Sequence, residues 1–266
     1  LSDDLSFQTL IFSAYFFGAM TTTLPAGVAS DRYGQPLLIR ISLVLTLISG
    51  ILIITLTEPV DLLIWRFIEG IGAGFVVSSA LSWIGYQKDT LKNTGLFMAS
   101  LNFGLLSGLI GSGWLTQISG EILLGAFVCT LITGIVFLFI LVHKIPRLGS
   151  KERISARLLA GETVSQIIRQ YPVWLSVIIL LGSTGYVQAV LPELSGYPVQ
   201  KVSIVLAMMN FATIIASLVT PYLKADPVLL IRISALVIVP SLFTFLITPV
   251  VSLAIGTVAG MSSIHL

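Results

Sequence analysis

Long apolar runs separated by short polar stretches dominate the pattern of residues along this chain. Spanning the hydrocarbon core of a bilayer takes about 20 mostly apolar residues. Backbone groups in lipid must be hydrogen-bonded within their own segment, so such runs predict helices and not strands. We expect about nine membrane-spanning helices, the last incomplete, at 7–26, 37–57, 62–86, 95–118, 122–143, 173–194, 202–222, 228–248 and 251–266.

Composition supports the same class. The 266 residues are 56% hydrophobic and 10% charged, whereas soluble domains average about 45–50% apolar and about 25% charged residues. The predicted fold class is therefore an all-α polytopic membrane protein whose main partner is the lipid bilayer. No basic patch suggests a nucleic-acid partner.

Metal and thiol chemistry find little support. Cys129 is the single cysteine and the two histidines lie far apart, so neither a disulfide nor a cluster with metal-ligand spacing is expected. We predict no metal and no cofactor. The chain opens without an initiator Met and stops within a helical pattern, so we expect a fragment of a longer protein.

The basic residues set the orientation. When the loops are assigned alternately to the two sides, the basic loop residues gather on one side, with Lys201 as the exception. Basic loops face the cytoplasm. We therefore expect a multi-pass protein of the cell (plasma) membrane with cytoplasmic loops at 27–36, 87–94, 144–172 and 223–227.

One hexapeptide occurs twice. LLIRIS stands at 37–42 and at 229–234, each copy opening an apolar run on the cytoplasmic side, six spans apart. Chance is one explanation in so apolar a chain, and a duplicated half of six helices is the other. Duplication predicts an N-terminal half at 1–143, a basic cytoplasmic linker at 144–172 and part of a C-terminal half at 173–266.

The stretch before the first copy carries a signature. LPAGVASDRYGQP, at 24–36, contains Gly27, Asp31, Arg32 and Gly34 in the pattern GxxxDRxG. It resembles the loop between the second and third helices of the major facilitator superfamily. In that family the loop braces the two halves at the cytoplasmic side and releases as the carrier changes conformation. The flanking glycines argue against a receptor-type DRY motif.

The loop departs from the family at one point. Basic residues usually follow the second glycine, but Gln35 and Pro36 stand there. Arg40, four residues into the next span, would supply a missing charge or reach the lipid headgroups.

The third visible span contains an intramembrane charge pair. WRFIEGIGAGF, at 65–75, resembles the RxxxG segment of the family's fourth helix, with Arg66 and Gly70 in place and Glu69 as an addition. Arg66 and Glu69 lie three apart on one helical face, where an ion pair offsets part of the cost of burying either. The pair marks a substrate or proton pathway, or else anchors the helix in the outer leaflet. Gly70 and Gly74 form a GxxxG face for close helix packing.

The next span is rich in glycine. In LNFGLLSGLIGSGW, at 101–114, Gly104, Gly108 and Gly111 resemble the fifth helix of proton-coupled drug antiporters in the family, although Leu109 replaces the proline that should follow Gly108. The glycines are interpreted as helix packing, with antiport as the alternative.

Scattered polar residues within spans are candidates for a substrate cavity. They are Asn102, Tyr186, Gln188 and Asn210. Each either contacts a substrate or bonds a neighbouring helix.

Taken together, the resemblance implies a two-half helical bundle that lacks the family's first helix and its last two to three. It implies a secondary transporter of small molecules, antiporter or symporter, that works by alternating access. The coupling ion would be H⁺, with Glu69 or Asp31 as the protonatable group, and export is possible. A non-transporting sensor or scaffold on the same fold is the alternative, and an enzyme is not expected because the spans show no facing catalytic groups.

Overall fold

The structure is a computed structural model that describes most of the first half of the chain and one helix of the second. The described residues are 5–55, 58–120, 123–143, 146, 165, 168, 169, 171, 175, 185, 188, 199–223, 226, 229, 232, 233 and 236.

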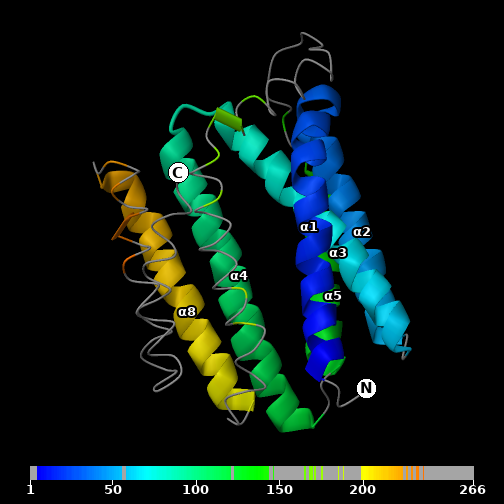
Figure 1. Cartoon of the computed structure of the whole chain (residues 1–266). Coiled ribbons are helices and arrows are strands. Elements are labelled where there is room, and N and C mark those ends of the chain that lie inside the picture. The colour runs from blue at the N-terminus through cyan, green and yellow to red at the C-terminus, as the bar shows by residue number, and fades with distance from the viewer. Residues whose placement is uncertain are drawn as a thin grey trace. The chain divides into compact units, whose positions relative to one another are not determined.

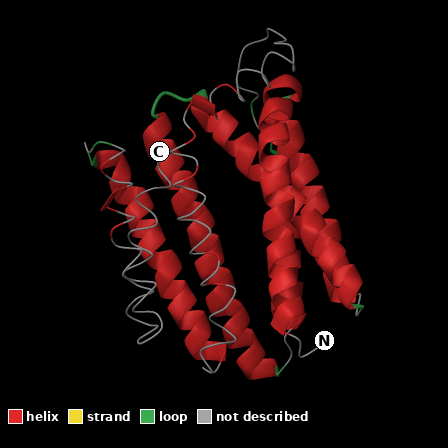
Figure 2. Ribbon diagram, in the orientation of Figure 1, coloured by secondary structure: helices red, strands yellow, loops and turns green. Residues whose placement is uncertain are grey.

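Every described element is helical. The α-helices are α1 (Leu5–Tyr33), α2 (Gln35–Thr55), α3 (Pro59–Gly85), α4 (Thr90–Ser119), α5 (Leu123–Val142) and α8 (Val199–Val219), and a short 3-10 helix, η1 (Thr220–Tyr222), follows α8. Figure 2 shows helices and connecting loops, with no strand among the residues it describes. The predicted all-α membrane class is confirmed.

Five of the described helices are long and apolar enough to cross a membrane: Leu10–Tyr33, Gln35–Thr55, Thr90–Ser119, Leu123–Val142 and Val202–Tyr222. The 27 residues of α3 would extend about 40 Å at about 1.5 Å per residue. Because α3 packs along both α1 and α2, we treat it as a span as well. The spans expected at 173–194, 228–248 and 251–266 lie outside the described residues, apart from isolated positions.

Contacts divide the chain into two compact units. The first unit holds α1, α2, α3 and α5, with α3 packed against α1 and α2, and α5 packed on α2 (Figure 1). The second unit holds α4, α8 and η1. In the second unit Gly95 lies near Ser217 and Gly113 near Ser203, so α4 and α8 run antiparallel.

This grouping differs from the division by chain order. The sequence assigns α4 to the N-terminal half at 1–143, whereas its described contacts are with α8. Shared ancestry and shared contacts are different criteria, because a helix at the edge of one half can pack on the other half. The boundaries at 143 and 172 remain a prediction.

The prediction of a loop at 27–36 is wrong, because this stretch is helical except for one residue. Helix α1 continues through Gly27, Asp31 and Arg32 to Tyr33, and α2 begins at Gln35. The break is a single residue, Gly34, at φ 100°, a left-handed conformation that glycine adopts without a Cβ clash. Its N–H donates to the Ser30 carbonyl at 2.9 Å and closes the last turn of α1.

The loop expected at 87–94 is likewise shorter than predicted. Helix α3 ends at Gly85 and α4 begins at Thr90, after Asp89. A polar helix end that extends beyond the apolar run cannot be seen in hydropathy alone. Most of 144–172 and of 223–227 lies outside the described residues.

Candidate functional site

Small residues bring α1 and α3 together. They recur every fourth position on the facing sides, as Gly18, Thr22, Ala26 and Ser30 on α1 and Gly70, Gly74, Ser78 and Ser82 on α3. Residues four apart share one helical face. A Cβ added at Gly70 would collide with the backbone carbonyl of Tyr15, and one added at Gly74 with Thr22. The two backbones therefore approach as closely as glycine permits.

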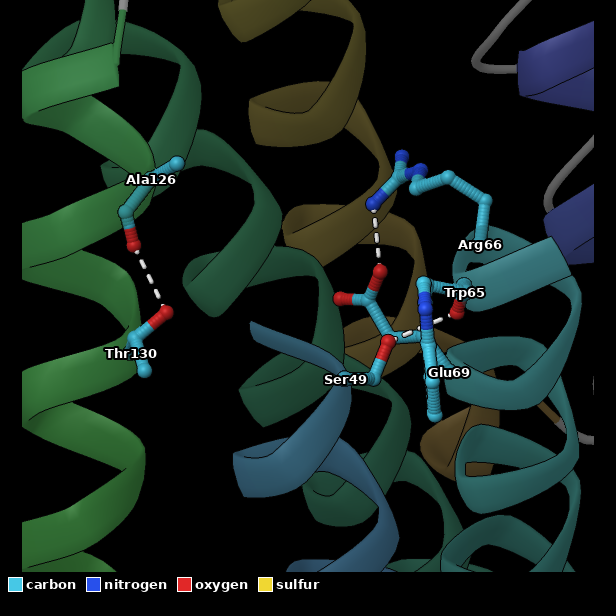
Figure 3. Close-up of polar contacts among 6 residues, drawn as sticks. All are labelled: Ser49, Trp65, Arg66, Glu69, Ala126 and Thr130. Atoms are coloured by element: carbon cyan, nitrogen blue, oxygen red, sulfur yellow. Dashed lines mark hydrogen bonds and ion pairs between the residues drawn. The ribbon is translucent and has the colours of Figure 1, made fainter. Parts of the chain in front are cut away.

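Hydroxyl groups then bond α3 to both neighbours. Ser42 of α2 donates to the Gly72 carbonyl at 2.7 Å, and Ser49 of α2 donates to the Trp65 carbonyl at 2.6 Å (Figure 3). Ser78 of α3 donates to the Thr23 carbonyl of α1 at 2.7 Å. Such bonds between spans hold helices in one register.

The charge pair lies in this braced part of α3. Arg66 Nη1 donates to Glu69 Oε2 at 2.6 Å, and the two side chains are 34% and 22% exposed (Figure 3). The Arg66 guanidinium also lies 5.3 Å from the centre of the Tyr15 ring of α1, within the range of a cation–π contact. The pairing expected from the three-residue spacing is thus present, and α1 contributes a third member that the sequence did not suggest.

Backbone contacts fix where the pair sits. The Ser49 bond holds the carbonyl of Trp65, next to Arg66, while Gly70, next to Glu69, lies against Tyr15. Both charged residues therefore project from a segment whose main chain is held from two sides. An intramembrane ion pair on a fixed backbone suits a role in binding or proton transfer better than a mobile surface pair.

A second polar cluster surrounds Asp31 at the other end of the first unit. Ser82 of α3 donates to Asp31 Oδ1 at 2.7 Å, and Gln35 Nε2 donates to the Ser82 hydroxyl at 3.3 Å. Tyr86 hydrogen-bonds to the Asp31 carboxylate. Burial, followed by the Asp31 charge and this hydrogen bond, raises the pKa of Tyr86 above its ordinary value.

The remaining residues that the sequence singled out at this end make other contacts. The Arg32 guanidinium is 5.3 Å from the centre of the Tyr33 ring. Arg40, half-buried in α2, has an Nε without a hydrogen-bond partner among the described residues. A Cβ added at Gly27 would meet no described atom within 4 Å. Sequence reasoning missed Ser82 and Tyr86, because they lie about fifty residues away from Asp31.

The glycines of α4 are placed differently from expectation. A Cβ added at Gly104, Gly108 or Gly111 would meet no atom of the described residues within 4 Å, so their packing role stays a prediction. Close approach to α8 occurs instead at Gly95, against the Ser217 carbonyl and Pro221, and at Gly113, against Ser203.

Two of the described candidate cavity residues bond within their own helices, and the third contacts α8. Asn102 donates to the Met98 carbonyl at 2.8 Å, and buried Asn210 donates to the Leu206 carbonyl at 2.8 Å. Gln188 Nε2 lies 4.0 Å from the sulfur of Met209. Tyr186 lies outside the described residues. In the part of the chain that is described, no three His, Cys, Asp or Glu side chains gather as metal ligands would.

Comparison with known proteins identifies the fold. The family model of the Major Facilitator Superfamily matches residues 1–266. The crystal structure of the human organic anion transporter MFSD10 (TETRAN) is similar, with TM-score 0.72 and 16% identity over 96% of this chain and 69% of that one. A mutant of the nucleoside transporter NupG has TM-score 0.70 and 15% identity over 98% of this chain and 73% of that one. No curated protein matches the chain.

Proposed function

The chain belongs to the major facilitator superfamily, and on that premise we propose that it works as a secondary active transporter of small solutes by alternating access, driven by a proton gradient. The family and the two transporter structures support a multi-pass membrane transporter and not an enzyme. The alternating-access mechanism, the coupling to protons and the location in the plasma membrane are our proposals beyond that.

The observation that carries the proposal is the Arg66–Glu69 pair of α3. Both side chains are only partly exposed, and they meet at 2.6 Å inside a helix that packs among membrane spans. A charged residue within a span is costly, so it is kept mainly where it serves a substrate or ion pathway. We assign Glu69 as the carboxyl group that exchanges the proton there, with Arg66 as its ion-pair partner.

Asp31 fits a different role. Its carboxylate accepts hydrogen bonds from Ser82 and Tyr86 at the end of the α1–α3 pair that we place on the cytoplasmic side. A carboxylate with fixed donors is suited to hold helix ends in one conformation. We assign proton coupling to Glu69 and the conformational brace to Asp31, with Arg32, Gly34 and Arg40 at the same end.

The contact between α4 and α8 suits movement between conformations. Helix α4 belongs to the first half of the sequence and α8 to the second, so displacement of the halves would shift one helix along the other. At Gly95 and Gly113 helix α4 approaches α8 closely, against the Ser217 carbonyl and the Ser203 side chain. The substrate would bind near the midplane, with Asn102, Gln188 and Asn210 as candidate contacts. Export is the direction suggested by the resemblance of the glycines in α4 to those of drug antiporters.

The test uses the full-length protein in proteoliposomes that contain a trapped pH dye. A library of small solutes is screened for solute-dependent proton movement, which a carrier produces and a sensor or scaffold does not. In Glu69→Gln we expect solute movement to lose its dependence on the pH gradient. Glu58→Gln, the same change at the exposed start of α3, is the matched control and should behave as wild type. Unchanged pH dependence in Glu69→Gln would remove Glu69 from the coupling step.

A further inference from the structure

We propose that Arg66 is the binding site for the carboxylate of a small organic anion, and that protonation of Glu69 is what makes Arg66 available to it. The inference rests on the proposed function and extends it to a class of substrate. It follows from the hydrogen-bonding capacity of Arg66, the net charge of the cluster and the way in which the cluster is held.

Arg66 has more hydrogen-bond donors than its contacts with the described residues use. A guanidinium carries five N–H groups in a planar fork that matches a carboxylate. Among the described residues one acceptor is bound to this fork, Glu69 Oε2 at 2.6 Å, and the Tyr15 ring covers the guanidinium at 5.3 Å without accepting a conventional hydrogen bond. The side chain is 34% exposed, so a solute can reach it.

The net charge of the cluster sets the class of ligand. With Glu69 ionised, the pair is neutral and the strongest acceptor position on Arg66 is occupied. When a proton binds Glu69 Oε2, the carboxylate loses its charge, and the N–H of Arg66 that it held becomes free for another oxygen. The site then carries one uncompensated positive charge, which favours an anion over a neutral or cationic solute.

Few other ionisable groups contribute at this level. From α1 the titratable group that faces Arg66 is Tyr15. Helix α2 bonds the neighbouring Trp65 carbonyl through Ser49, and its charged residue, Arg40, lies near its first turn. On α3 itself Glu58 and Asp61 lie at the start of the helix. Within the described part of the chain, Arg66 and Glu69 are thus the pair whose protonation state changes the local charge.

Proton and anion therefore bind cooperatively, and each raises the affinity of the site for the other. A carrier that is loaded by both together moves them in the same direction and without net charge. The site thus favours symport, and an inward proton gradient would drive import. It opposes the export suggested by the resemblance of α4, which would need the proton and the substrate to compete.

Binding of probe anions to the purified full-length protein tests the inference without knowledge of the natural substrate. Propionate and benzoate are the probes, their neutral amides are the controls, and ligand-dependent thermal stabilisation at mildly acid and mildly alkaline pH gives the affinities. Wild type should bind the anions more tightly at acid pH. Glu69→Gln, which mimics the protonated acid, should bind them about tenfold more tightly than wild type at alkaline pH.

Two further variants distinguish loss of the anion site from misfolding. The double variant Arg66→Gln, Glu69→Gln has no buried charge left unpaired, so it should fold yet show no preference for the anions over their amides. Arg66→Lys in the Glu69→Gln background keeps the charge without the fork, and most of the gain should disappear. Anion binding that is no tighter in Glu69→Gln, or that weakens at acid pH in wild type, would overturn the proposal.

The outcome is separable from that of the proposed function. Solute-dependent proton movement by a neutral solute, together with no preference for the probe anions, would leave the carrier standing and remove the anion site. Proton-linked anion binding without solute movement in proteoliposomes would keep the site and indicate a sensor.

Discussion

The two units of the molecule pack apolar helices by different means. In the first unit, serines of one helix donate to backbone carbonyls of the next: Ser42 and Ser49 from α2 to α3, and Ser78 from α3 to α1. In the second unit, Asn102 of α4 and Asn210 and Thr213 of α8 donate to the carbonyl four residues earlier in their own helix. Helix α4 approaches α8 most closely at Gly95 and Gly113.

The difference concerns how firmly each unit fixes the register of its helices. Bonds between helices specify one register. The bonds named for the second unit lie within single helices and do not themselves set the register of α4 against α8, so we expect this contact to shift more readily than those of the first unit. The first unit carries the Arg66–Glu69 pair. The unit without described serine bonds across helices joins α4, from the first half of the sequence, to α8, from the second.

The largest expected effect comes from breaking the charge pair in the braced unit. Arg66→Gln leaves Glu69 without its partner, which should destabilise the protein by about 2–3 kcal/mol, less than the about 3–5 kcal/mol for a fully buried pair because both side chains are partly exposed. Thermal unfolding in detergent measures it. Lys92→Gln, at an exposed position of α4 in the second unit, should change stability by no more than about 0.5 kcal/mol. Equal losses of stability in the two variants would show that Arg66 contributes no more than an exposed surface charge.

Steric contacts give the next effect. Gly70→Ala places a Cβ against the Tyr15 carbonyl, a backbone atom that cannot rotate away, and should cost about 2 kcal/mol. Gly113→Ala meets the side chain of Ser203, which can turn, so it should cost about 1 kcal/mol or less. Both are measured by thermal unfolding at neutral pH. Gly95→Ala, whose Cβ would meet the Ser217 backbone carbonyl, should cost about as much as Gly70→Ala. A loss in Gly113→Ala as large as in either would show that Ser203 cannot turn away.

Single hydroxyls give the smallest effect and sharpen the comparison. Ser42→Ala removes a bond between helices and should cost about 0.6 kcal/mol, the average for such bonds in membrane proteins. Thr213→Val removes a bond within α8 and should have an effect close to zero, because the carbonyl keeps its helical partner. When several of these serines of the first unit are replaced together, their summed loss of unfolding free energy becomes large enough to measure by thermal unfolding. Similar costs in α2 and α8 would contradict the proposed division.

Much of the fold could be predicted because its causes are local. Run length identifies the spans, and the three-residue spacing places Arg66 beside Glu69, as the 2.6 Å contact shows. The four-residue spacing of Gly70 and Gly74 likewise places both on one face, where they lie against α1. Each of these depends only on helix geometry.

What could not be predicted depends on partners distant in the sequence. Nothing in the sequence near Asp31 points to Ser82 and Tyr86, and nothing within α4 shows that Gly95 and Gly113, not Gly104, lie against α8. The continuation of α1 to Tyr33 was missed because polar residues end a hydropathy run without ending a helix. Cross-helix serine bonds are hidden for the same reason, since their acceptors are backbone carbonyls, which every residue has.

The central claim is that the first unit keeps its geometry while the α4–α8 contact shifts, and distances between spin labels in the full-length protein test it most directly. Cys129, exposed on α5, is first replaced by Ala. One label pair then replaces Met20 of α1 and Val60 of α3, and the other replaces Trp114 of α4 and Phe211 of α8, all exposed positions. Between alkaline and acid pH, and between wild type and Glu69→Gln, we predict an unchanged α1–α3 distance distribution and a shifted α4–α8 distribution. A shift within α1–α3, or an α4–α8 distribution that never changes, would contradict the account.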